Sequence, residues 1–311
     1  MKRKITTTIK RMVSFGLVLA MMLTCTNVYA AEEEVTSVDS TDEQEYATSI
    51  TYNVETGEIT YGADQTGDLS DASSYAIQYD EYGIDPLYDG IIGLDNRVRI
   101  TNTTDSPYRN ICYIEAYFKN NKVKKGSGTL VYSDVLLTSG HVIYDKELGG
   151  WAYHVKVTPA KNGKDSEPLG STYAMNLTSN EEWTVNGNHE WDWAILDLKK
   201  GYNTWQSFGY YDNYYNQLGT SVTAIGYPDE EGHYYYMYSD TNSISNVTEY
   251  WYMALCDFTK GESGGALIDD RTGMLIGVIT GYKEITPNEE YANFHVRITP
   301  DLCSRIKEHF D

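Results

Sequence analysis

The chain from Arg97 to its C-terminus consists of short segments rich in Val, Ile, Thr and Tyr, separated by turns rich in Gly, Asn, Asp and Pro. Apolar residues rarely recur there at helical spacing. This pattern is typical of all-β barrels and sandwiches, whose strands are short and end at turn residues. The expected strands cover residues 111–118, 129–132, 153–158, 192–198, 221–226, 234–238, 251–255, 266–268 and 274–280, and a further strand starts at Val135. Gly126-Ser127-Gly128 is interpreted as a turn, and Thr299-Pro300 predicts a short C-terminal helix.

Residues 1–30 have the pattern of a secretory signal peptide. Basic residues precede an apolar run at 13–23, and Val28-Tyr29-Ala30 matches a signal-peptidase site. The run is about half of the ~20 residues that a membrane-spanning helix needs. We therefore expect an exported, extracellular protein without stable membrane insertion. Cys25 leaves a lipid anchor as the alternative, although Thr24 is larger than the residue usual before a lipidated cysteine.

Residues 31–89 contain no Lys or Arg and open with a cluster of carboxylates. Self-repulsion and low apolar content argue against an independent core. We interpret this segment as an acidic propeptide, with a solubilising tail as the alternative. A different composition begins near Gly90, and the strand pattern falls into two sets, residues 90–200 and 201–311.

Charge and cysteine usage exclude several classes of function. A net charge of −21 and a pI near 4.6 disfavour nucleic-acid binding, which depends on basic patches. Beyond the signal, Cys112, Cys256 and Cys303 allow one disulfide with a free thiol, or none. No metal-binding motif appears, so we expect no cofactor and no catalytic metal, with calcium held by surface carboxylates left open. We also expect a monomer.

The stretch Gly261-Glu262-Ser263-Gly264-Gly265 contains the candidate nucleophile, Ser263. Glycines beside a serine let the backbone turn tightly and bring amide groups to one point, where an oxyanion can bind. Gly261 and Ser263 are the expected donors of this oxyanion hole. The same motif also occurs in ordinary turns, so its interpretation requires a base and a group that orients the base.

His141 and Asp192 are the candidates for these two roles. His141 follows an apolar strand and the small residues 138–140, which leave room for an imidazole at a cleft. Asp192 opens an apolar strand, and a carboxylate that enters a core needs a partner. Accepting loop N–H groups is its alternative role, and Asp197 is its competitor. The order His, Asp, Ser is one of the known orders of a catalytic triad.

These motifs resemble those of the chymotrypsin-like, or trypsin-like, serine proteases. Residues 138–141 are similar to the Thr-Ala-Gly-His of that family, 192–196 to its Asp-Ile-Ala-Leu-Leu, and 261–265 to its Gly-Asp-Ser-Gly-Gly. The segments 95–104, 158–163, 225–228 and 296–299 look like the secreted bacterial glutamyl endopeptidases. The resemblance runs from about Gly90 to the C-terminus. It implies two six-stranded antiparallel β-barrels with the triad between them, and a serine endopeptidase that acts on proteins or peptides.

The expected substrate pocket departs from the glutamyl branch. Ile279 stands where that branch has a histidine for the substrate carboxylate, and Phe258 stands where it has a hydroxyl residue. Strict glutamate specificity is therefore doubtful. Asp257 matches the position at which trypsin-like enzymes bind Lys or Arg, so basic, apolar and mixed preferences stay open. Thr280 and Gly281 complete the expected pocket.

The resemblance also suggests two maturation sites. Gly90-Ile91-Ile92-Gly93 is similar to the new N-terminus of activated trypsin-like enzymes, which implies an ammonium of Ile91 paired with Glu262. The glutamyl branch suggests a cut after Asp89 instead. A protease-like module without activity, which binds peptides or cell-wall material, is the alternative function.

Overall fold

The computed structural model describes residues 48–62, 90–284 and 291–310. All of them belong to one unit, Tyr46–Asp311. The predicted signal peptide and most of the predicted propeptide lie outside the described residues.

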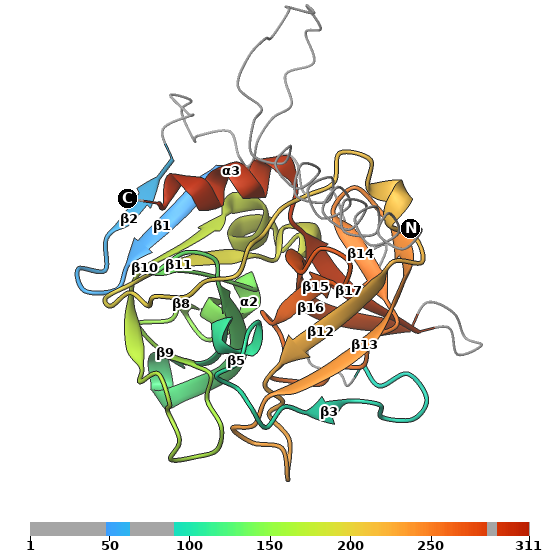
Figure 1. The fold of residues 1–311 in the computed structure, drawn as a ribbon. Coiled ribbons are helices and arrows are strands. Elements are labelled where there is room, and N and C mark those ends of the chain that lie inside the picture. The colour runs from blue at the N-terminus through green and yellow to red at the C-terminus, as the bar shows by residue number, and fades with distance from the viewer. Residues whose placement is uncertain (1–47, 63–89, 285–290, 311) are drawn as a thin grey trace, which may run out of the picture. The chain divides into compact units, whose positions relative to one another are not determined.

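Two closed antiparallel barrels form the fold, as predicted (Figure 1). The first contains β4 (Ile111–Phe118), β5 (Lys122–Leu130), β6 (Val135–Thr138), β9 (His154–Pro159), β10 (Thr172–Asn180) and β11 (Ala194–Leu198). Its order is β11-β6-β5-β4-β9-β10, and pairing of β10 with β11 closes it. β4 has six buried residues out of eight, which explains why its sequence reads as a nearly continuous apolar run.

The second barrel contains β12 (Ser221–Gly226), β13 (Tyr238–Val247), β14 (Trp251–Ala254), β15 (Ala266–Asp269), β16 (Met274–Glu284) and β17 (Tyr291–Arg297). Its order is β12-β15-β16-β17-β14-β13, closed by β12 and β13, and β3 (Val98–Arg99) pairs with β13. The strand predicted at 234–238 is wrong, because residues 231–235 form a turn and the strand begins at Tyr238.

Short elements connect and cover the barrels. They are η2 (Tyr108–Asn110), η3 (Lys119–Asn121), α2 (Gly140–Ile143), β7 (Tyr144–Asp145), β8 (Gly150–Trp151), η4 (Glu182–Asn186), η5 (His189–Trp191), η6 (Tyr214–Gln217) and α3 (Pro300–Glu308). The predicted C-terminal helix is confirmed as α3. The hydroxyl of Thr299 accepts a hydrogen bond from the N–H of Leu302 at 3.2 Å, which caps the helix. Leu302 and Ile306 anchor it in the core.

Two strands come from the predicted propeptide. β1 (Ser49–Asn53) pairs with β10, and β2 (Ile59–Tyr61) pairs with β1. Figure 1 shows this hairpin in blue beside β10 and α3. Part of the acidic segment therefore joins the sheet of the first barrel.

The turn predicted at Gly126-Ser127-Gly128 is wrong, because these residues lie inside β5. A Cβ on Gly126 would lie 2.6 Å from Val142 Cγ1, and one on Gly128 would lie 2.6 Å from Leu136 Cδ2. The glycines therefore serve close packing rather than a turn. Cys112, Cys256 and Cys303 are all buried free thiols, which leaves the disulfide alternative without support. Burial raises the pKa of the Cys112 thiol.

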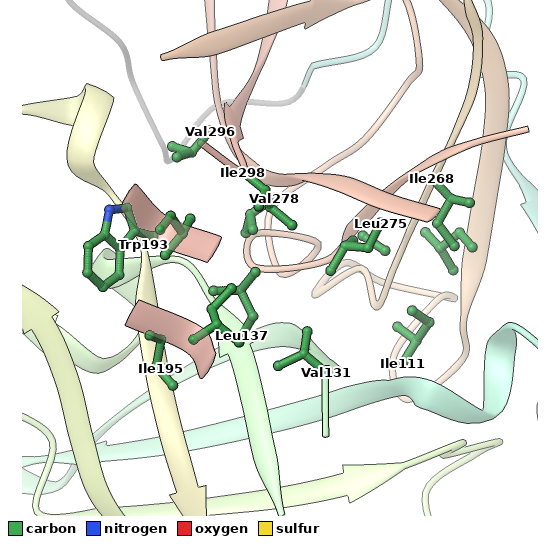
Figure 2. Close-up of a cluster of buried hydrophobic side chains, with 14 of the residues drawn as sticks. Ile111, Val131, Leu137, Trp193, Ile195, Ile268, Leu275, Val278, Val296 and Ile298 are labelled. Atoms are coloured by element: carbon green, nitrogen blue, oxygen red, sulfur yellow. The ribbon is translucent and has the colours of Figure 1, made fainter. Parts of the chain in front are cut away.

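One hydrophobic cluster joins the two barrels. It includes Leu137 of β6 and Ile195 of β11 from the first barrel, with Val278 of β16 and Val296 of β17 from the second (Figure 2). Because the two barrels share this close-packed core, the ends of their strands keep fixed positions relative to each other.

Candidate active site

Asp192 holds His141 at two points. The His141 backbone N–H donates to Asp192 Oδ1 at 2.8 Å, and His141 Nδ1 lies 2.7 Å from Asp192 Oδ2. The aspartate is fully buried, whereas the imidazole keeps 12% of its surface exposed. With Nδ1 engaged, the other ring nitrogen, Nε2, is left to act toward solvent or a substrate.

Asp192 remains ionised in this buried position. Burial alone raises the pKa of the carboxyl, but His141 and the hydroxyl of Thr280 outweigh it, so the pKa lies below its ordinary value. Thr280 belongs to β16 of the second barrel and donates its hydroxyl to Asp192 Oδ2. The sequence placed Thr280 in the substrate pocket, which stays a prediction, and the bond to Asp192 shows that its hydroxyl supports the His–Asp pair.

Hydrogen bonds between the barrels bring the Ser263 loop to the same place. The Ser263 carbonyl accepts from the N–H of Ser127 at 2.8 Å, and the Gly261 carbonyl accepts from the Ser127 hydroxyl at 2.9 Å. The Ile279 carbonyl accepts from both the Gly264 N–H at 2.8 Å and the Ser139 hydroxyl at 2.7 Å. The Ile279 carbonyl thus links Gly264, the residue after Ser263, to Ser139, which lies two residues before His141.

Glycine is required at two positions of this loop. Gly261 and Gly264 have φ of +95° and +85°, a region that other residues enter only with strain. A Cβ on Gly264 would lie 2.1 Å from both the Ser127 carbonyl oxygen and Thr138 Oγ1. The glycines read from the sequence as turn formers therefore also allow the two barrels to approach.

The backbone N–H groups of the loop divide into two sets. Those of Glu262, Gly264 and Gly265 donate to protein carbonyls at 3.0, 2.8 and 2.9 Å. Within the described part of the chain, the N–H groups of Gly261 and Ser263 have no protein acceptor. These are the two groups that the sequence assigned to an oxyanion hole.

Arg97 is the ionic partner of Glu262. The two side chains are each 2% exposed, and Arg97 Nη1 lies 2.7 Å from Glu262 Oε2. The N–H of Thr259 donates to the same oxygen at 2.8 Å. Burial raises the pKa of Glu262 to about 7, against the opposing effects of Arg97 and Thr259. The expected partner Ile91 is half-buried, and its pairing with Glu262 stays a prediction, since it requires the ammonium that a cut before Ile91 would create.

Asp257 and Phe258 hold the segment that starts at Gly90. Asp257 accepts the N–H groups of Ile92 and Asn96, one on each carboxylate oxygen, at 2.7 and 2.9 Å. The backbone of Phe258 exchanges hydrogen bonds with Gly90 at 2.9 and 3.3 Å. The expected pocket residues Phe258, Ile279, Thr280 and Gly281 are all buried.

Sequence reasoning missed two neighbours of the site, Trp183 and Arg97. The ring of Trp183, in η4, meets the His141 ring edge-on with centroids 6.4 Å apart. A Cβ on Gly140 would lie 2.6 Å from Trp183 Cδ1, so the indole packs against the chain at His141. Trp183 lies in no motif, and Arg97 lies in the segment 95–104, whose resemblance to the glutamyl branch does not show its pairing with Glu262. Both residues act through tertiary contacts.

Comparison with known sequences relates the chain to known proteases. Residues 126–278 match the trypsin-like peptidase domain family. The chain is 29% identical over 247 residues to the glutamyl endopeptidase of Bacillus licheniformis, covering 77% of this chain and 75% of the relative. It is 30% identical over 286 residues to the extracellular metalloprotease of Bacillus subtilis, covering 89% and 88%.

Solved structures share the fold. A Glu endopeptidase in complex with MPD aligns with a TM-score of 0.60 at 21% identity, covering 70% of this chain and 98% of that one. The protease Anisep from Arthrobacter nicotinovorans aligns with a TM-score of 0.55 at 18% identity, covering 68% and 98%. The name of the Bacillus subtilis relative points to a metal-dependent protease, whereas the matched family model and the glutamyl endopeptidase relatives are of the serine type. The chain therefore belongs to the family of trypsin-like peptidases and is a serine-type endopeptidase.

Proposed function

We propose that this chain is a secreted serine endopeptidase that cleaves peptide bonds with a triad of His141, Asp192 and Ser263. The Ser263 hydroxyl attacks the peptide carbonyl while His141 Nε2 takes its proton and then returns it to the leaving amine. Water releases the acyl group in the second half of the reaction. The free N–H groups of Gly261 and Ser263 bind the oxyanion, which is worth about 3 kcal/mol per donor in comparable enzymes.

The observation that carries the proposal is the two-point contact between His141 and the buried Asp192. A carboxylate that is fully buried yet ionised, aimed at Nδ1 of a partly exposed histidine, leaves Nε2 as a base. Among the described residues, no group of three His, Cys, Asp or Glu side chains is placed to hold a metal ion, and the proposed steps use none.

A fluorophosphonate probe tests the nucleophile. It should label the wild-type protein and the Ser245→Ala control, which changes an exposed serine of β13, but not Ser263→Ala. Ser263→Ala should lower kcat for peptide hydrolysis by about 10⁴-fold or more, because the triad acts as a unit. Full activity in a folded Ser263→Ala protein would contradict the assignment. A folded wild type that neither reacts nor cleaves would favour the silent binding module.

We further propose that residues 1–30 direct secretion and that maturation cuts the chain after Asp89. The described residues contain no helix long and apolar enough to cross a membrane. Gly90 is held by Phe258 and by Asn293, whose side-chain amide donates to the Gly90 carbonyl at 2.7 Å. A Cβ on residue 90 would lie 2.5 Å from Asn293 Oδ1, so a side chain larger than that of glycine would clash with Asn293. N-terminal sequencing of the secreted enzyme should read Gly90-Ile91-Ile92.

A start at Ile91 would instead support the activation pair between the new ammonium of Ile91 and the carboxylate of Glu262. A start before residue 80 would contradict both cuts.

For substrate choice, we propose an apolar side chain on the acyl side of the cleaved bond. Both oxygens of Asp257 are already bound to N–H groups, and Phe258 and Ile279 are apolar and buried. The side chains of Phe258 and Ile279 offer a buried glutamate no hydrogen bond. Profiling of cleavage in a peptide mixture tests this preference. Dominant cuts after Glu, or after Lys and Arg, would overturn it.

A further inference from the structure

The β1–β2 hairpin fills an edge that the first barrel leaves open. β9 pairs with β10 only at Thr172 and Tyr173. β1 then pairs with β10 over Asn176–Asn180, while β11 occupies the other side of β10. Without β1, backbone groups of this part of β10 would form an unpaired edge, which folded proteins cover or protect.

Side chains reinforce this pairing. Ile50 is only 5% exposed, although it comes from a segment with little apolar content. The ring of Tyr52 stacks on Trp151 with centroids 5.9 Å apart, and the hydroxyls of Thr51 and Thr178 are hydrogen-bonded at 2.8 Å. Glu55 lies 2.5 Å from Lys199, and Arg305 of α3 donates to the Ser49 hydroxyl.

The end of this pairing lies next to the candidate active site. Ser49 pairs with Asn180, the last residue of β10, and the Thr48 carbonyl accepts the N–H of Glu181 at 3.0 Å. Asn180 accepts the N–H of Trp183 on its side chain at 2.9 Å. The indole of Trp183 then packs against the His141 ring. A continuous set of contacts thus runs from β1 to the imidazole.

We propose that the mature enzyme keeps the β1–β2 hairpin as a bound strand pair, which positions the Trp183 segment beside His141. The proposal rests on the proposed cut after Asp89 and on the proposed role of His141. The hairpin is then a structural part of the active enzyme, although the cut after Asp89 breaks its covalent link to the barrels. The partner of the β10 edge is a named segment of the same chain, residues 48–62.

A controlled cut tests retention whatever the natural maturation site is. A recognition sequence for a site-specific protease is placed within residues 63–89 of the full chain, and the purified protein is cleaved and passed over a sizing column. The hairpin fragment should elute with the barrels and separate from them only in denaturant. A fragment that leaves the wild-type protein under native conditions would overturn the proposal.

Two isoleucines of the hairpin provide a matched pair of variants. Ile50→Asp places a charge at the buried position and should release the fragment after cleavage. Ile59→Asp changes a residue of β2 that is 45% exposed and should retain it. Loss of the fragment should lower kcat about tenfold with little change in KM, because the imidazole is misplaced rather than the substrate site.

Adding a synthetic peptide of residues 46–62 should restore kcat in a saturable manner. An unchanged kcat in enzyme freed of the hairpin would refute the positioning role. Failure of the proposed function gives a different result, since an enzyme that does not depend on Ser263 could still retain the fragment on the column.

Discussion

Replacing Arg97 by Met should destabilise the protein through Glu262, the residue beside the candidate nucleophile. Arg97 also contacts Asp95 and Glu230, at 2.9 and 2.5 Å, so its guanidinium serves three carboxylates. At 2.7 Å and an effective dielectric constant of about 20, the Arg97–Glu262 attraction is about 6 kcal/mol. Part of it offsets the desolvation of the two charges, and removing one partner of a buried pair costs about 3–5 kcal/mol.

The pH dependence of this loss follows from the protonation of Glu262. Its folded pKa, about 7, lies above its ordinary value of 4.5, so its contribution to stability is present below pH 4.5 and is lost as the pH rises through 7. Without Arg97 the folded pKa rises further and more stability is lost above neutrality. The deficit of Arg97→Met should therefore be larger at pH 8 than at pH 5.

Guanidinium unfolding of the Ser263→Ala protein, which avoids self-digestion, measures this deficit. Arg99→Met is the matched control, because Arg99 lies two residues further along the chain, in β3, and is exposed, with its guanidinium carbon 3.6 Å from the centre of the Tyr236 ring. The double variant Arg97→Met/Glu262→Leu should recover most of the stability, since it leaves no buried charge at Glu262. The reasoning is refuted if Arg97→Met and Arg99→Met agree within about 0.5 kcal/mol at pH 8.

Two other substitutions test groups around the site. Thr280→Val removes the hydroxyl that donates to Asp192 and should lower kcat/KM by about 10- to 100-fold, because a hydrogen bond to a charged group is worth about 1.5–3 kcal/mol. Unchanged kinetics would contradict this. His295→Leu removes a fully buried histidine whose pKa burial lowers from 6.5 to about 4. Stability from such a group is present above pH 6.5 and is lost as the pH falls toward 4, by about 3 kcal/mol. Between pH 6.5 and pH 4, the free energy of unfolding measured with guanidinium should fall less in His295→Leu than in the wild type. An equal fall in both proteins would contradict a lowered pKa of His295.

The acidic segment shows where sequence reasoning reached its limit. Low apolar content argued against an independent core in residues 31–89, and the structure shows Tyr52 of this segment packed against the core of the first barrel and Ile50 buried. The glycines of β5 were misread for a similar reason. Val142 and Leu136, which pack against these glycines, lie on other elements. The local sequence around a glycine does not show which side chains of other elements pack against it.

By itself, the sequence determined the all-β class, the C-terminal helix and the candidates His141, Asp192 and Ser263. Strand periodicity, capping and glycine-flanked turns are local properties, and the order of the three motifs is visible along the chain. Tertiary structure alone decided that Thr280 supports Asp192, that Arg97 pairs with Glu262, and that the hairpin at 49–61 completes the edge of β10. These contacts join residues far apart in the sequence, and they form because buried charges and open strand edges must find partners wherever the fold supplies them.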